Sequence, residues 1–130
     1  MRVEVTVVGR QTTDDETAQT TLTAHGILRK DGDAVIITYT EPDAKTVITF
    51  SENTATVERR GELSSCLILQ PAVTHLCDYH TPYGTMTLGV TASSVQWSET
   101  TGVLRLRYTL DMGNDMVTHH DLEIIVKEVS

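Results

Sequence analysis

The fold is decided by residues 103–127, which read VLRLRYTLDMGNDMVTHHDLEIIVK. Apolar and polar side chains alternate on both sides of a Gly-Asn-Asp sequence, and alternation with a period of two is typical of a strand that is buried on one face. Residues 113–115 therefore predict a three-residue hairpin loop. With this loop the cross-strand neighbours on one face are apolar: Leu106 with Leu122, and Leu104 with Ile124.

The opposite face of this hairpin supports the same register, because it brings side chains of opposite charge together. Apolar pairs and opposite-charge pairs each contribute roughly 0.2–1 kcal/mol, and a slip of one residue would lose them all. The register also places His120 on the apolar face opposite Tyr108, while His119 points to solvent. The predicted charged pairs are Arg105 with Glu123 and Arg107 with Asp121.

The strand pattern continues through the rest of the chain. Threonine and valine, which are β-branched and favoured in strands, are abundant, and no segment repeats apolar residues at helical spacing. We therefore expect an all-β chain with almost no helix, in which an antiparallel meander closes into a barrel or packs as a sandwich. The expected strands cover residues 2–11, 18–30, 34–41, 45–51, 54–60, 63–70, 73–80, 85–92, 94–98, 103–112 and 116–127.

Length and charge narrow the possibilities further. The chain has 130 residues, of which 39% are hydrophobic, and a chain of this length buries roughly two-thirds of its unfolded surface. Residues 1–130 are therefore expected to form a single β-barrel domain. Ten basic residues against 18 acidic residues give a net charge of −8. This balance argues against binding to nucleic acid or to an anionic membrane, both of which require basic surfaces.

The N-terminal residues lack the basic region and the apolar run of a signal peptide. No segment approaches the roughly 20 apolar residues that cross a bilayer. We therefore expect the mature protein to begin at Met1 and to stay in the cytoplasm. Cys66 and Cys77 are equidistant from the Pro71-Ala72 turn, so in a reducing compartment they are expected to face each other as two packed thiols rather than as a disulfide.

An Asp31-Gly32 sequence predicts a two-residue type I′ hairpin between the second and third expected strands. Its register sets Gly26 opposite Ile37 and Ala24 opposite Tyr39. Small residues opposite large ones either fill a tapering barrel or leave a groove open.

Three short segments carry a resemblance to a known family. They are Tyr39-Thr40-Glu41, Arg59-Arg60-Gly61 and the sequence YHTPYGT at residues 79–85. With these segments the chain resembles the YwiB-like family of small bacterial proteins, a domain of unknown function. The resemblance implies a calycin-type β-barrel, related in shape to lipocalins, which carry small ligands inside. The Gly-x-Trp signature of lipocalins near the N-terminus is absent.

The set Tyr39, Glu41 and Arg59 is the most informative group of polar residues. Tyr39 and Glu41 share one face of a strand, and Arg59 is within reach of Glu41 across or through the barrel. An arginine inside a barrel suits a carboxylate or phosphate ligand. The alternative is an internal ion pair that closes the barrel and orders its strands.

Three further residues complete the expected lining of a ligand site. Thr81-Pro82-Tyr83-Gly84 reads as a turn, and at a barrel mouth it would place Tyr79 and Tyr83 on the rim. Its alternative role is a corner that only fixes the register. His120, opposite Tyr108, is expected to be a core or rim histidine. The five histidines have no spacing typical of zinc ligands, so no metal and no cofactor are expected.

Two functions of different classes remain. The first is binding of a small molecule, anionic or amphipathic, at the barrel mouth. The second is a protein-interaction or dimerisation module with a filled barrel. No nucleophile or acid–base pair stands out, so no catalytic residue is assigned and an enzyme is the less favoured interpretation. Aromatic residues make up only 5% of the chain, which favours a small cavity or none.

Overall fold

The computed structural model describes residues 1–113 and 117–129. In these residues it contains a single ten-stranded antiparallel sheet, with the strand order β6-β5-β4-β3-β2-β1-β10-β9-β8-β7, and no helix. The strands are β1 (Arg2–Thr13), β2 (Glu16–Asp31), β3 (Ala34–Thr40), β4 (Ala44–Ser51), β5 (Thr54–Gly61), β6 (Ser65–Leu69), β7 (Thr74–Thr81), β8 (Gly84–Ser98), β9 (Val103–Asp111) and β10 (Val117–Glu128).

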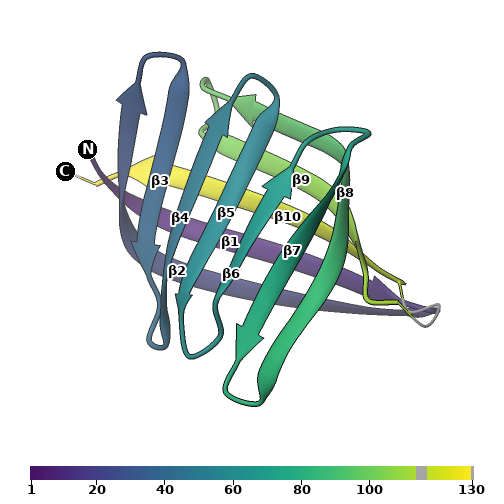
Figure 1. Cartoon of the computed structure of the whole chain (residues 1–130). Helices are drawn as coiled ribbons and strands as arrows, with labels where there is room; N and C mark the ends of the chain where they lie inside the picture. The colour runs from purple at the N-terminus through teal and green to yellow at the C-terminus, as the bar shows by residue number, and fades with distance from the viewer. Residues whose placement is uncertain (114–116, 130) are drawn as a thin grey trace.

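The sheet curls into a flattened barrel with two layers, whose strands cross at a steep angle (Figure 1). Strands β3 to β7 form one layer, and β1, β10 and β9 form the other. The long strands β2 and β8 bend at opposite sides of the barrel and so contribute to both layers. The prediction of an all-β antiparallel barrel is therefore confirmed.

A β-bulge allows β8 to take part in both layers. The ladder with β9 shifts between Ala92 and Ser94, so Ser93 has no partner. Before the bulge the buried positions are even-numbered, as in Val90 and Ala92, and after it they are odd-numbered, as in Val95. The two strands expected at residues 85–92 and 94–98 are thus one continuous strand with one extra residue.

The barrel is nearly closed where the two end strands of the sheet, β6 and β7, approach each other. Just before β6, Ser64 exchanges two backbone hydrogen bonds with His80, at 2.9 and 2.8 Å. At the other end of this seam, the amide of Ala72 donates to the carbonyl of Ala92 on β8, at 3.0 Å. No continuous ladder joins β6 to β7 in the described residues. These few backbone hydrogen bonds close the barrel wall.

The middle of the barrel is filled by side chains from both layers. The fully buried residues come from alternate positions of nearly every strand, as the period of two predicts. Burial of each such side chain stabilises the fold by about 1.5–3 kcal/mol. The largest are Val3, Val5, Ile37, Ile48, Leu69, Val90, Leu104, Leu106 and Ile124.

The last hairpin has the predicted register. Leu106 pairs with Leu122, Leu104 with Ile124, and Tyr108 with His120. On the outer face, Arg105 lies 3.6 Å from Glu123 and Arg107 lies 3.2 Å from Asp121. The predicted loop at residues 113–115 extends outside the described residues.

The predicted register of the β2–β3 hairpin is wrong by two residues. Gly26 pairs with Tyr39 rather than with Ile37, and Ala24 pairs with Val5 of β1 and has no partner on β3. The loop consists of Gly32 and Asp33, because Asp31 already pairs with Ala34. Gly32 has a φ of 60° and Asp33 has no positive φ, which fits a type II′ turn rather than type I′.

The two cysteines do not face each other. Cys66 is exposed and Cys77 is buried, and both thiols are free. The two residues are neighbours across the seam, where the backbone of Cys66 lies beside the thiol of Cys77. Cys77 is on the buried inner face and Cys66 is on the exposed outer face. The expectation of two packed thiols is correct only for Cys77.

Candidate functional site

A row of polar residues crosses the inner face near the end of the barrel that holds the β3–β4 and β5–β6 turns. Register places Tyr39, Thr46, Arg59 and Ser65 side by side on β3, β4, β5 and β6. Tyr39 and Thr46 are buried. The row contains two of the residues that the sequence singled out, and it shows that Arg59 points inward.

Arg59 and Glu41 form an ion pair, with 2.8 Å between Nη2 and Oε2. The side chain of Glu41 is 14% exposed and that of Arg59 is 39% exposed. Glu41 is held by the β3–β4 turn, where its amide donates to the carbonyl of Ala44 at 2.7 Å. The predicted contact between these two residues is therefore present.

The guanidinium of Arg59 makes fewer hydrogen bonds than its five donors allow. Its Nε is buried and has no hydrogen-bond partner among the described residues. An unpaired buried donor costs about 1–3 kcal/mol. The fork of Arg59 is thus fixed in place by Glu41 and still has donors to offer at the open end of the barrel.

The hydroxyl of Tyr39 lies in the electrostatic field of this ion pair. Burial raises the pKa of Tyr39, and the negative charge of Glu41 raises it further. The hydroxyl of Thr46 and the positive charge of Arg59 lower the pKa in part. Tyr39 is therefore neutral at physiological pH, as a proton-bearing hydroxyl beside the ion pair.

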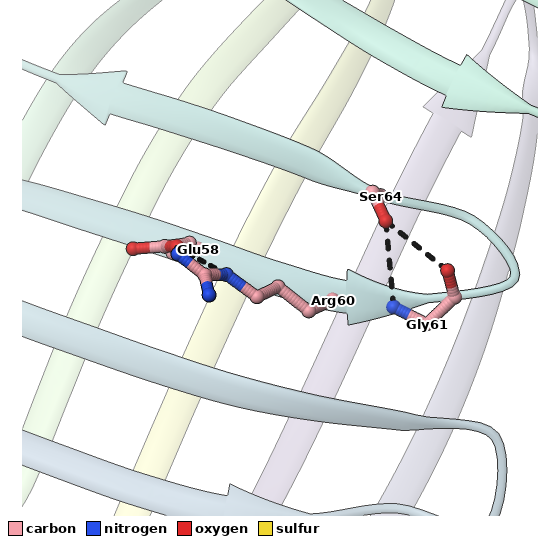
Figure 2. A network of polar contacts seen from close by, with 4 residues as sticks. All are labelled: Glu58, Arg60, Gly61 and Ser64. Carbon is pink, nitrogen blue, oxygen red and sulfur yellow. Dashed lines mark hydrogen bonds and ion pairs between the residues drawn. The ribbon is translucent and has the colours of Figure 1, made fainter.

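The β5–β6 turn next to Arg59 is ordered by its own hydrogen bonds (Figure 2). Ser64 Oγ donates to the carbonyl of Gly61 at 3.1 Å and accepts from its amide at 3.4 Å. A side chain at Gly61 would lie 2.3 Å from the carbonyl oxygen of Asp43, so glycine lets this turn pack on the β3–β4 turn that carries Glu41. Arg60, in contrast, points outward and pairs with Glu58 at 2.6 Å (Figure 2).

Tyr79 and Tyr83 have different positions at this end. Tyr79 directly precedes His80, which bonds to Ser64 across the seam, and Tyr79 is half-buried. Tyr83 is 99% exposed in the β7–β8 turn. That turn is fixed by Thr81, whose Oγ1 donates to the carbonyl of Gly84 at 2.9 Å and accepts from the amide of Tyr83 at 3.1 Å.

His120 lies apart from the Arg59 row. Its ring stacks on Tyr108, with 4.9 Å between centroids and 5° between planes, and its Nε2 is 2.8 Å from Thr118 Oγ1. Burial lowers the pKa of His120, and the charge of His119 lowers it further. Burial raises the pKa of Tyr108 to about 12. Both rings are therefore neutral at neutral pH.

Sequence reasoning missed two residues of this end. Thr46 stands between Tyr39 and Arg59 because of the β3–β4 and β4–β5 registers. Met86 pairs with Tyr79 on the inner face but stays about half-exposed, which shows that this end is open. The signal for Met86 is its place at the start of an alternating Met-Leu-Val pattern, where a strand enters the barrel.

The described residues contain neither a cluster of metal ligands nor a helix that could cross a membrane. Within residues 1–113 and 117–129, no three His, Cys, Asp or Glu side chains converge as metal ligands. A membrane-crossing helix of sufficient length and apolar character does not occur in that part of the chain.

Comparisons with known proteins agree with the fold. No curated protein matches the chain. The crystal structure of the ywiB protein from Bacillus subtilis is similar to it, with a TM-score of 0.79 over 98% of this chain and 92% of the other, at 16% identity. At this identity the likeness shows the fold alone. The model of a domain of unknown function, DUF1934, matches residues 5–124. The chain therefore belongs to this YwiB-like family of uncharacterised barrel proteins.

Proposed function

We propose that the barrel binds a small amphipathic molecule through its anionic group, at the open end where Arg59 lies. The observation that carries the proposal is the state of the Arg59 guanidinium. The Arg59 side chain is 39% exposed, and its ion pair with Glu41 is formed through Nη2, so the guanidinium, with its five donors, has capacity beyond this contact. Arginine recognises carboxylates and phosphates through two parallel N–H donors.

The surroundings of Arg59 suit a ligand with an apolar part. Tyr79 is half-buried and Met86 is about half-exposed at the same end, while the neutral Tyr39 is buried with its hydroxyl beside Thr46. The interior beyond them is filled by residues such as Ile37 and Leu106. This supports a ligand held at the mouth rather than one enclosed in the middle of the barrel.

We place this binding in the cytoplasm, a reducing compartment in which Cys66 and Cys77 stay as free thiols.

Binding of the anionic dye anilinonaphthalene sulfonate tests the proposal. We expect saturable one-to-one binding to the native protein, weakened at least about tenfold in Arg59→Gln, because a hydrogen bond to a charged group contributes about 1.5–3 kcal/mol. Arg60→Gln is the matched control. Arg60 lies on the same strand and also pairs with a glutamate, but it points outward.

A second variant protects the test from a simple loss of folding. Glu41→Gln keeps the guanidinium and removes the carboxylate that competes for it, so the dye should bind more tightly. The proposal is wrong if Glu41→Gln weakens binding, or if Arg60→Gln weakens it as much as Arg59→Gln. Thermal melts of all variants check that each is folded.

A resident ligand would be direct support. Native mass spectrometry of the freshly purified protein, beside a denaturing spectrum, should show a discrete mass excess that is lost on denaturation and reduced in Arg59→Gln. A bare mass in the presence of added dye would count against the proposal.

The second candidate function, a protein-interaction or dimerisation module, is favoured by exposed apolar side chains on one side of the barrel. Leu76 on β7 is 78% exposed, and Tyr83 in the following turn is 99% exposed. Light scattering separates the two functions. A native protein that is a dimer, and that becomes a monomer in Leu76→Ser, would support the dimerisation module. A native protein that is a monomer would weigh against it.

A further inference from the structure

A second pocket lies on the outer wall of the barrel, where β1, β10 and β9 run side by side. It has a volume of about 340 Å³, and outward-facing polar residues line it together with Tyr108 and His120, whose side chains belong to the inner face. Two rows of outward-facing residues frame it. One row contains Arg10, Asp121 and Arg107, and the other contains Thr12 and His119.

The charges in this pocket are not balanced. Register places Asp121 between Arg10 and Arg107 on neighbouring strands. Arg107 pairs with Asp121, with 3.2 Å between Nε and Oδ2. Arg10 donates from Nε to the amide oxygen of Gln19 at 3.0 Å and forms no ion pair within the described residues. Two guanidiniums therefore face one carboxylate, in a chain whose net charge is −8.

Hydroxyl groups surround the two arginines. Thr12 Oγ1 lies 3.1 Å from Thr17 Oγ1 at one side of the pocket. At the other side the bulge in β8 exposes Ser93, which has no partner residue in the ladder and whose hydroxyl donates to the carbonyl of Arg107 at 3.4 Å. Bulges often re-aim a side chain beside a functional site. The pocket thus combines two planar arginine forks with hydroxyl groups on opposite sides.

We propose that this outer pocket binds the phosphate group of a small phosphorylated molecule. A tetrahedral phosphate accepts hydrogen bonds from several directions, which suits donors on opposite sides, and arginine forks match its geometry. The strong negative charge of the whole chain repels an extended polyanion, so the ligand is a small molecule rather than nucleic acid. The pocket is separate from the Arg59 end and does not depend on the function proposed there.

A titration with inorganic phosphate, followed by amide chemical shifts at constant ionic strength, tests this proposal. We expect saturable shifts for amides of β1, β9 and β10 around the pocket. Arg107→Gln should weaken binding at least about tenfold, since one charge-assisted bond is lost, and Arg10→Gln should also weaken it. Asp121→Asn removes the repulsive carboxylate and should strengthen binding.

Arg105→Gln is the matched control for Arg107→Gln. Both arginines point outward from β9, their side chains are 57% and 61% exposed, and each pairs with a carboxylate on β10. Phosphate affinity should be unchanged in Arg105→Gln. In Arg59→Gln the shifts of amides around the outer pocket should persist, which separates this pocket from the barrel mouth. Shifts that do not saturate, or equal losses in Arg105→Gln and Arg107→Gln, would overturn the proposal. Phenyl phosphate, used as a second probe, should bind at least as tightly as inorganic phosphate.

Discussion

Gly26 occupies a position where two strands and the core approach too closely for a side chain. A Cβ there would lie 2.5 Å from the carbonyl oxygen of Thr38 and 2.9 Å from Cγ2 of Val5. We expect Gly26→Ala to lower the free energy of unfolding by about 1–3 kcal/mol, because backbone and core must shift to admit the methyl group. Urea denaturation measures this.

Gly89→Ala is the control for Gly26→Ala, because the nearest atom to its Cβ would be 3.6 Å away. Its effect should stay within about 0.5 kcal/mol. Similar losses for the two variants would show that strand preference rather than close approach explains the effect.

His120 should make the stability of the protein depend on pH in the acid range. Burial lowers its pKa in the folded state below the usual value of 6.5, so the unfolded state binds more protons in the window between the two pKa values. The stabilisation is complete above the unfolded pKa and is lost as pH falls through the folded pKa. We expect His120→Gln to show a smaller loss of stability than the native protein between neutral and mildly acid pH.

Denaturation curves at several pH values measure this difference, with His25→Gln as an exposed control. An equal pH dependence in the native protein and in His120→Gln would contradict the assignment.

Among single residues, the sequence predicts contacts well where a strand pattern fixes both partners. The Arg59–Glu41 contact and the Tyr108–His120 stack are both expected from the side of the strand on which each residue falls. Arg10 was not recognised, because its neighbours Asp121 and Arg107 come from the other end of the chain. Nothing in the local pattern around Arg10 indicates that β1 pairs with β10.

At the scale of elements, the bulge in β8 determines which face of the strand is buried. Deletion of Ser93 would reverse residues 94–98, turning Val95 and Trp97 outward and Ser94 and Gln96 inward. Loss of two apolar side chains from the core is expected to cost about 3–6 kcal/mol. Trp97 is the single tryptophan of the chain, so its emission should shift to the red in the deletion variant.

Substitution of the same residue is the control for this deletion. Ser93→Ala keeps the residue count and should change stability by no more than about 0.5 kcal/mol. An unshifted emission spectrum for the deletion variant would mean that the bulge does not set the register.

The two hairpins show which registers a sequence can specify. The β9–β10 register is unique because a slip breaks both the apolar and the charged pairs. The β2–β3 register differs from the prediction by two residues, and a shift of two keeps every side chain on its face. The hydrophobic pattern cannot distinguish such registers. The choice then depends on whether Gly32 is the first or the second residue of the turn.

At the scale of the whole molecule, the seam between β6 and β7 is the weakest part of the barrel wall. It is held by the Ser64–His80 bonds and by the Ala72–Ala92 bond, whereas β1 has full ladders on both sides. Local opening requires the least energy where few backbone bonds are lost. We expect amides of β6 and β7 to exchange with deuterium faster than those of β1 and β10, measured by hydrogen exchange.

Equal protection of these strands would show that the seam opens only with global unfolding. The closed barrel was expected from the family resemblance, because the strand pattern alone left a sandwich open, and the place of closure was not predicted. The seam involves few residues, and the different exposure of Cys66 and Cys77 depends on how the curled sheet meets itself.

The position of β1 in the middle of the sheet also has a consequence for how the protein folds. Val3 pairs with Glu128 and Thr12 pairs with His119, so one neighbour of this strand is the last of the ten strands to be synthesised. Contacts between such distant segments form slowly. While the ribosome is still producing β2 to β9, β1 has a single partner strand and an unpaired edge. The barrel wall therefore becomes complete only after β10 has left the ribosome.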